Sequence, residues 1–136
     1  MSWVELVAAA EAIRFDAGAL DPRLRDRRVV GVGWATVEAD RAFRELSTVL
    51  DGPADWVPQE RDALLGATRW RRDPSPVDGV ALFVLEPDTE GRLAACLARF
   101  GEGVAAAYLA GGGEADRIVP VNARWGPYAI VRSRSG

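Results

Sequence analysis

The sequence contains no histidine and no lysine, so all 17 of its basic residues are arginine. Without histidine, Ser-His-Asp and Cys-His catalysis and every histidine-ligated metal site are excluded. Without lysine, Schiff-base chemistry and phosphate binding by a P-loop lysine are excluded as well. An all-arginine basic set is typical of a GC-rich coding sequence, and by itself it indicates no function.

Cysteine, long apolar runs and excess charge are also scarce. The single cysteine, Cys96, permits no internal disulfide, which favours a reducing cytoplasmic location. No apolar run approaches the roughly 20 residues of a membrane span, and the N-terminal stretch lacks the features of a signal peptide. The net charge of −3 gives no broad attraction to nucleic acid. We therefore expect a cytoplasmic protein with no membrane or nucleic-acid partner.

The residues that are present suit one domain, because 136 residues with 49% hydrophobic content can form a real core. Ser2 and Glu5 form a capping box, and the apolar spacing after them predicts a helix that ends near residues 16–18. Further helices are predicted at 38–50 and 88–99, strands at 28–37, 55–57, 64–72, 80–85, 104–110, 118–121 and 128–132, and a flexible break at 111–113.

The segment 82–109 resembles methylmalonyl-CoA epimerases and related glyoxalase-fold proteins, the vicinal oxygen chelate superfamily. Leu85-Glu86-Pro87 resembles the "LLEP" of that family, and Gly101-Glu102-Gly103 resembles its "GeG" turn. The opening strand and helix at 32–43 are similar as well. The resemblance implies an α+β fold of paired βαβββ modules in a single domain, 1–136. Its expected parts are an N-terminal helix and loop (1–27), a first module (28–87), a linking helix (88–101) and a shortened second module (102–136).

The resemblance also implies where a catalytic metal would sit. In register with the family's metal ligands, this sequence has Gly31, Phe83, Ala106 and, approximately, Ile130. A divalent cation needs nitrogen or oxygen donors, and these side chains supply none. We therefore expect no metal, no other cofactor, and no metal-dependent epimerase or glyoxalase activity. In the second module GGGEAD replaces a helix, and we expect the N-terminal helix to cover the sheet there.

Side chains alternate along a strand, so the four positions define the face that forms the cup of the sheet. Gly33 and Ala35 follow Gly31 onto this face, as do Ala81, Val104 and other neighbours of the remaining positions. The candidates for ligand binding are Gly31, Gly33, Phe83, Leu85, Ala106, Tyr108, Tyr128 and Arg132, and no catalytic residue is assigned. A small and apolar surface with two phenols and one guanidinium is typical of a small-molecule pocket.

Three tryptophans and one pair of glycines could have either a structural or a ligand-binding role. Trp34 is predicted to face the helices and to belong to the core. Trp70 and Trp125 could stack on a planar ligand or simply pack, and packing is favoured. The Gly31-x-Gly33 pair is similar to a dinucleotide fingerprint, but Thr36 occupies the position of its third glycine.

The polar candidates have structural alternatives too. Glu86, Glu90 and Glu102 could polarise a ligand, although a solvated cluster at a helix start is favoured. Cys96 lies on the apolar face of its helix, which indicates a buried structural thiol in preference to a nucleophile.

Three functions follow from this pattern. The first is metal-independent binding of an apolar or aromatic small molecule in the cup. The second is a metal-free lyase or isomerase that uses the tyrosines and the arginine of the cup. The third is a structural module whose cup is filled. The shortened second module predicts an open sheet edge, and hence a homodimer. The sequence alone leaves the identity of the ligand open.

Overall fold

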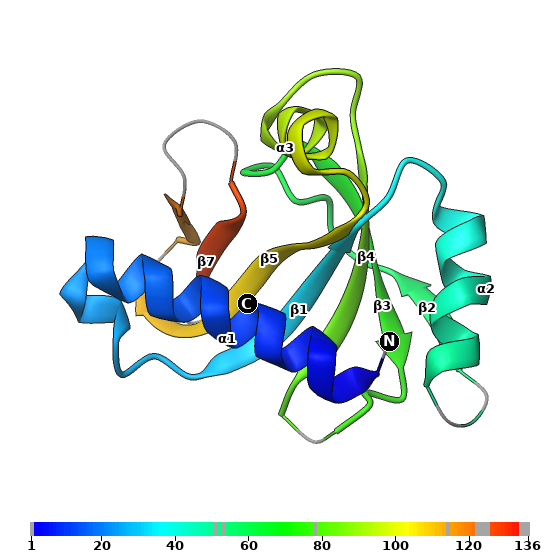
Figure 1. Cartoon of the computed structure of the whole chain (residues 1–136), viewed down its shortest axis with the longest axis horizontal. Helices are drawn as coiled ribbons and strands as arrows, with labels where there is room; N and C mark the ends of the chain where they lie inside the picture. Colours follow the sequence, from blue (N-terminus) through cyan, green and yellow to red (C-terminus); the bar gives the residue numbers. More distant parts are fainter. Residues whose placement is uncertain are drawn as a thin grey trace.

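The computed structural model describes residues 2–50, 52, 54–77, 79–113, 115–121 and 126–133. Three α-helices, a short 3-10 helix and seven strands make up this part of the chain (Figure 1). In chain order they are α1 (Trp3–Leu20), η1 (Pro22–Leu24), β1 (Val29–Ala35), α2 (Ala39–Val49), β2 (Asp55–Pro58), β3 (Ala67–Asp73), β4 (Ala81–Pro87), α3 (Arg92–Phe100), β5 (Gly103–Gly113), β6 (Arg117–Pro120) and β7 (Tyr128–Ser133). The strands form one sheet in the order β2-β3-β4-β1-β5-β7-β6.

The sheet consists of two similar halves that meet at β1 and β5, which pair in antiparallel fashion. In the first half β1 is followed by α2, and then by three strands of which the last, β4, returns parallel to β1. The second half repeats the arrangement, because β7 returns parallel to β5 and pairs with β6. Among the described residues this half lacks the helix and one strand. The predicted α+β fold of paired βαβββ modules, with the second shortened, is therefore confirmed.

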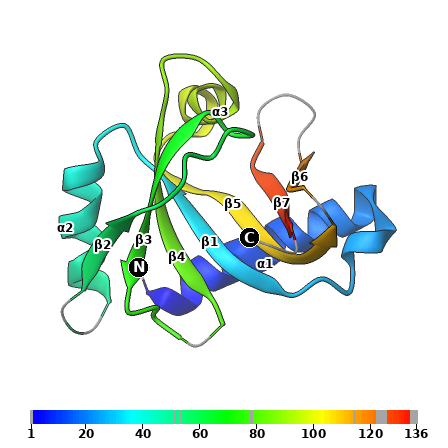
Figure 2. The same cartoon turned by 180° about the vertical axis from the view of Figure 1, so that it is seen from behind.

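The N-terminal helix covers the second half of the sheet, as predicted. Ser2 caps it, since the side-chain oxygen accepts a hydrogen bond from the backbone N–H of Glu5 at 3.3 Å. Its buried side chains, among them Leu6 and Ile13, belong to a core cluster with residues of β1, β5 and β7. Helix α2 covers the first half on the same face, so both helices lie on one side of the sheet (Figures 1 and 2). The other side forms the cup.

Several predicted boundaries were wrong for local reasons. Helix α1 runs to Leu20 instead of ending at 16–18. Helix α3 begins at Arg92 and not at residue 88, with Gly91 at the cap position. Strand β3 begins at Ala67 and not at residue 64, because a turn precedes it in which the backbone N–H groups of Gly66 and Ala67 donate to the carbonyl oxygen of Asp62.

The predicted flexible break at 111–113 is part of strand β5 instead. Gly111 lies so close to β7 that a Cβ built there would be 1.5 Å from the carbonyl oxygen of Arg132. Only glycine fits such an approach of two backbones. The glycine run therefore allows close strand packing here, where the sequence had indicated a break.

Strand β5 also departs from regular alternation. Its pairing with β1 shifts between Gly33 and Trp34, so Val104 pairs with Trp34 and packs on the helix side. The bulge leaves Ala105 and Ala106 both in the core cluster on the cup side. The prediction that Val104 faces the cup was therefore wrong. Among the described helices, none combines the length and the hydropathy that a membrane-spanning segment requires.

Candidate binding site in the cup of the sheet

The structure places the predicted cup residues on one face of the sheet. Phe83, Leu85, Ala106, Tyr108, Tyr128 and Ile130 share the core cluster on this side. Gly31 and Gly33 face the same way, because a Cβ built on either would touch side chains of this cluster. Arg132 lies at the mouth, with its guanidinium carbon 5.6 Å from the ring centroid of Tyr108. The alternation used for β1, β4 and β7 is therefore correct, although the ligand-binding role of these residues stays a prediction.

One half of the cup, next to α3, is filled. Leu65 and the helix side chains Leu93 and Cys96 pack there against Leu85 and Tyr128, and all of them are buried. The space above β1 is occupied as well, since a Cβ at Gly33 would be 2.7 Å from a methyl carbon of Leu85. Of the eight predicted candidates, Leu85, Ala106 and Tyr128 belong to this packed part, and Gly33 lies against Leu85. Gly31 lies beneath Phe83 and Tyr108, and a Cβ there would touch both side chains.

The other half of the cup is a groove of about 530 Å³. Phe83 and Tyr108 lie in its floor, with their ring centroids 5.0 Å apart. The described residues that line it are Arg28, Val30, Gln59, Arg71, Ala81, Phe83, Tyr108, Ala110, Gly111, Arg132 and Ser133. Three of the predicted candidates, Phe83, Tyr108 and Arg132, therefore line this groove.

Sequence reasoning missed two arginines of the cup, which come from β3. Arg69 pairs with Leu85 and Arg71 with Phe83, so both share the face of these β4 residues. Trp70, which lies between these two arginines, was not assigned to a face of the sheet in the sequence analysis. Trp70 packs on the helix side, where its ring centroid is 5.5 Å from that of Phe43. Placing Trp70 in the core would have placed both arginines in the cup by alternation.

A buried polar network lies beside the groove. The Tyr108 hydroxyl donates to Oδ2 of Asp62 at 2.9 Å, and Nη1 of Arg69 is 3.5 Å from the same oxygen. The other carboxylate oxygen of Asp62 accepts from the backbone N–H of Leu65 at 3.0 Å. Burial, together with the adjacent Asp62 carboxylate, raises the pKa of Tyr108 far above its ordinary value. Arg69 is only 7% exposed, and its guanidinium carbon is 5.2 Å from the Phe83 ring centroid.

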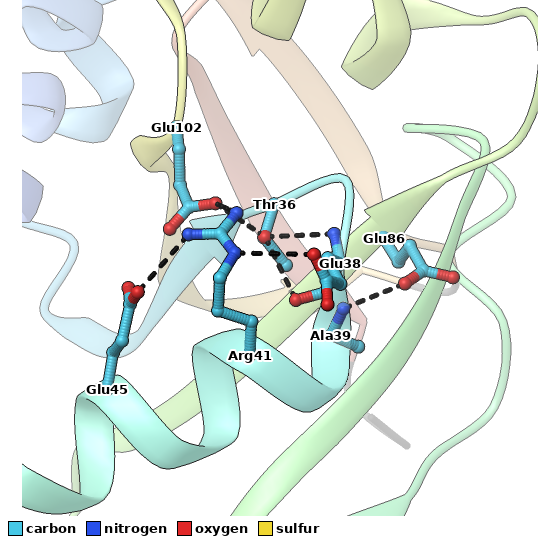
Figure 3. Close-up of polar contacts among 7 residues, drawn as sticks. All are labelled: Thr36, Glu38, Ala39, Arg41, Glu45, Glu86 and Glu102. Atoms are coloured by element: carbon cyan, nitrogen blue, oxygen red, sulfur yellow. Dashed lines mark hydrogen bonds and ion pairs between the residues drawn. The ribbon is translucent and has the colours of Figure 1, made fainter.

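The glutamates near the "LEP" turn have structural roles. Figure 3 shows that Glu86 reaches from β4 to the start of α2, where its Oε2 accepts from the backbone N–H of Ala39 at 2.9 Å. Glu102 accepts from the Thr36 hydroxyl at 2.6 Å and pairs with Arg41 at 2.8 Å. The third glutamate, Glu90, is exposed. The favoured interpretation of a helix-start cluster is correct for Glu86, although the helix is α2 and not α3.

The tryptophans and the cysteine of the described chain lie in the core. Trp34 packs in the cluster on the helix side, as predicted, and Trp70 packs there as favoured. Trp125 lies outside the described residues. Cys96 is buried, and this burial raises the pKa of its thiol. A raised thiol pKa disfavours the reactive thiolate and fits the predicted structural role.

The four residues that the sequence resemblance put in register with metal ligands do not fit a divalent cation. Gly31, Phe83, Ala106 and Ile130 carry no donor atom, and among the described residues no group of three histidine, cysteine or carboxylate side chains comes together. Asp62, the carboxylate of the buried network described above, already contacts the Tyr108 hydroxyl, the Arg69 guanidinium and the backbone N–H of Leu65.

Comparison with known proteins gives structural likeness only. No family model and no curated protein matches the sequence. A hypothetical protein from Bacillus halodurans superposes with a TM-score of 0.53 at 13% identity, over 80% of this chain and 95% of that one. A methylmalonyl-CoA epimerase in complex with methylmalonyl-CoA gives 0.44 at 18% identity, over 62% of this chain and 60% of that one. A variant of the Streptomyces coelicolor epimerase, in complex with 2-nitronate-propionyl-CoA, gives 0.43 at 18% identity, over 61% and 59%.

The strand order and the placement of the helices identify the architecture. The chain has the glyoxalase-like fold. Two halves, each closed by a strand that returns parallel to its first, meet at antiparallel β1 and β5 and share one cup. A glyoxalase-like fold supports many chemistries, so the function has to be argued from the groove.

Proposed function

We propose that this protein binds an apolar or aromatic small molecule in the open half of the cup, without a metal ion. The observation that carries the proposal is the groove of about 530 Å³ with Phe83 and Tyr108 in its floor. Ligand sites are concave, commonly of roughly 300–1,000 Å³, and combine an apolar lining with a few polar groups. The groove has both, since Val30 and Ala81 line it beside the aromatic rings and the arginines.

Fluorescent probes test this proposal directly. N-phenyl-1-naphthylamine is neutral and 8-anilinonaphthalene-1-sulfonate is anionic, and both become bright in apolar sites. We expect at least one of them to bind saturably with one site per chain. Ala81→Phe should abolish this binding by filling the groove, because Ala81 lines it and is only half-buried.

A matched control separates groove filling from a general effect of the added ring. Ala8→Phe makes the same change at an exposed position of α1, and binding should be unchanged. If neither probe binds saturably to the native protein, or if Ala81→Phe leaves binding intact, the proposal is wrong. The first of these results would favour the structural module with a filled cup.

A metal-free lyase or isomerase is the second candidate, and one observation favours it. Asp62 and Arg69 line a smaller pocket of about 390 Å³ beside the groove, and the Tyr108 hydroxyl donates to the Asp62 carboxylate. A carboxylate at a pocket next to a guanidinium could accept a carbon-bound proton while the cation stabilises the enolate that forms.

Deuterium exchange tests this second candidate. Phenylpyruvate, an aromatic 2-oxo acid with acidic C–H bonds, would be incubated with the protein in D2O and followed by NMR. Exchange faster than in buffer, and lost in Asp62→Asn, would support an enzyme. Exchange at the buffer rate would rule against proton abstraction from this probe and leave the binding function as it stands.

A further inference from the structure

We propose that the groove takes an organic anion, with the negative group held by Arg28 and Arg71 and the apolar body packed against Val30, Ala81 and Phe83. The chemical class is a carboxylate, sulfonate or phosphate attached to an apolar or aromatic body. The inference rests on the proposed function, because it assigns the charge of the ligand that the groove is proposed to bind.

All the charged side chains in the described lining of the groove are positive. This described lining contains three arginines, one amide and two hydroxyl-bearing residues, Tyr108 and Ser133, and no carboxylate. The protein as a whole has a net charge of −3, so the positive groove is a local feature and not a consequence of the overall balance. A concave site lined by charge of one sign concentrates counter-ions of the opposite sign.

Two of these arginines have no internal counter-ion. Neither Arg28 nor Arg71 makes a side-chain hydrogen bond or ion pair with any described residue, and Nε of Arg71 is buried without a hydrogen-bond partner. Arg71 is half-buried on β3 beside Phe83, where its charge is partly shielded from water. A partly desolvated cation without a partner is costly, and a bound anion would relieve that cost.

The neighbouring pocket contains an arginine with a structural role, Arg69, which serves for comparison. That pocket brings Glu60, Asp62 and Asp116 together with Arg61 and Arg69, so its charges are mixed. Arg69, almost fully buried, has the Asp62 carboxylate 3.5 Å away. Arg28 and Arg71 differ from this pattern in facing a cavity instead of an acidic residue. The ion pair therefore gives Arg69 a structural role, which the half-buried Arg71 lacks, while Arg28 is an exposed residue of the groove lining.

The side-chain chemistry narrows the ligand further. Guanidinium is planar and weakly hydrated, and its parallel N–H groups match the two oxygens of a carboxylate or a phosphate. The remaining wall is apolar, with Val30, Ala81, Ala110 and the edge of Phe83. An inorganic anion would leave this wall in contact with water, and a neutral hydrocarbon would leave the two cations unpaired. A molecule with both parts satisfies both surfaces.

The probe pair introduced above separates this inference from the proposed function. The anionic probe carries a sulfonate on an anilinonaphthalene body, and the neutral probe has the same body without the charge. We expect the anionic probe to bind the native protein at least about tenfold more tightly, as one charge-assisted contact allows. Its affinity should also fall with rising KCl, while that of the neutral probe should not.

Arginine substitutions then locate the anion site. Arg71→Met keeps the length of the side chain and removes its charge, and it should weaken the anionic probe about tenfold while changing the neutral probe less than about twofold. Arg71→Lys keeps the charge and should retain most of the preference. Arg28→Met should act in the same direction as Arg71→Met. Arg44→Met, at an exposed position of α2, removes the same charge and should change neither affinity.

Each outcome has one meaning. Equal affinity of the native protein for both probes, both lost in Ala81→Phe, would leave the proposed function standing and overturn the anion inference. An anionic preference that survives Arg28→Met and Arg71→Met together would overturn it as well, because the charge would act elsewhere. No saturable binding of either probe would overturn the proposed function and the inference with it.

Discussion

Replacement of Tyr108 by phenylalanine tests the buried network beside the groove. The Tyr108 hydroxyl is the nearer of the two partners of Asp62 Oδ2, at 2.9 Å against 3.5 Å for Arg69. Asp62 is 7% exposed and Tyr108 is 1% exposed, so water cannot readily replace the lost donor. A buried hydrogen bond to a charged group contributes about 1.5–3 kcal/mol. Tyr108→Phe should therefore lower the free energy of unfolding by about 2 kcal/mol.

Tyr128→Phe is the matched control, since its hydroxyl donates to a neutral acceptor, the backbone carbonyl of Arg92, at 3.1 Å. That substitution should cost about 1 kcal/mol or less. Urea unfolding followed by tryptophan fluorescence gives both values if the slope of the transition is unchanged. The double variant Tyr108→Phe/Asp62→Asn should reveal coupling of at least about 1 kcal/mol between the two sites.

Three results would refute this account of the network. One is a cost of Tyr108→Phe within about 0.5 kcal/mol of zero, the ordinary range for a surface change. Another is a cost no larger than that of Tyr128→Phe. The third is additivity of Tyr108→Phe with Asp62→Asn, which would show that the contact between the hydroxyl and the carboxylate contributes nothing to stability.

Four further predictions concern the helix, alkaline pH, metal content and assembly. Leu6→Ala, on the buried face of α1, should cost about 2–5 kcal/mol by thermal or urea unfolding, whereas Phe15→Ala, at a 72% exposed position of the same helix, should cost almost nothing. Because the folded pKa of Tyr108 is raised from 10.0, unfolding above about pH 10 releases its proton, and stability should fall with rising pH there. Tyr128 and Cys96 act in the same direction, so Tyr108→Phe should make the fall shallower by about 1 kcal/mol per pH unit without removing it. Elemental analysis of the purified protein should find no stoichiometric zinc, nickel, cobalt or manganese. Light scattering should give a dimer at micromolar concentration, and a mass near 14.7 kDa throughout that range would contradict the predicted homodimer.

The part of the fold that the sequence predicts is the part with strong periodic signals. The apolar stripe behind Ser2 predicted a helix, and the short GGGEAD segment predicted that this helix would cover the second module, where α1 indeed lies. Alternation from the assumed ligand positions placed Phe83, Tyr108 and Tyr128 on one face, because strands β4, β5 and β7 are regular at these residues.

The open groove could not be predicted, because it depends on how strands fit together in space. The arginine contribution of β3 follows from the orientation of Trp70, which alternation within β3 alone does not fix. The displaced Val104 results from a bulge against β1, which is a property of two strands and not of one. Gly111 was taken as a break because its role, a close approach to the backbone of Arg132, involves a residue distant in sequence.

Close packing around the two glycines of β1 limits which side chains these positions can take. At Gly31 a Cβ atom would lie 2.8 Å from a ring carbon of Phe83, and at Gly33 it would lie 2.7 Å from a methyl carbon of Leu85. Such distances are shorter than real Cβ contacts, so a larger side chain at either glycine would require its neighbour to shift. A larger side chain at Gly31 would therefore require the ring of Phe83 to shift. The glycines of β1 and the bulky residues of β4 form one packing arrangement. In this arrangement the open space of the cup lies beside Arg28, Arg71 and Arg132, at the opposite end from α3.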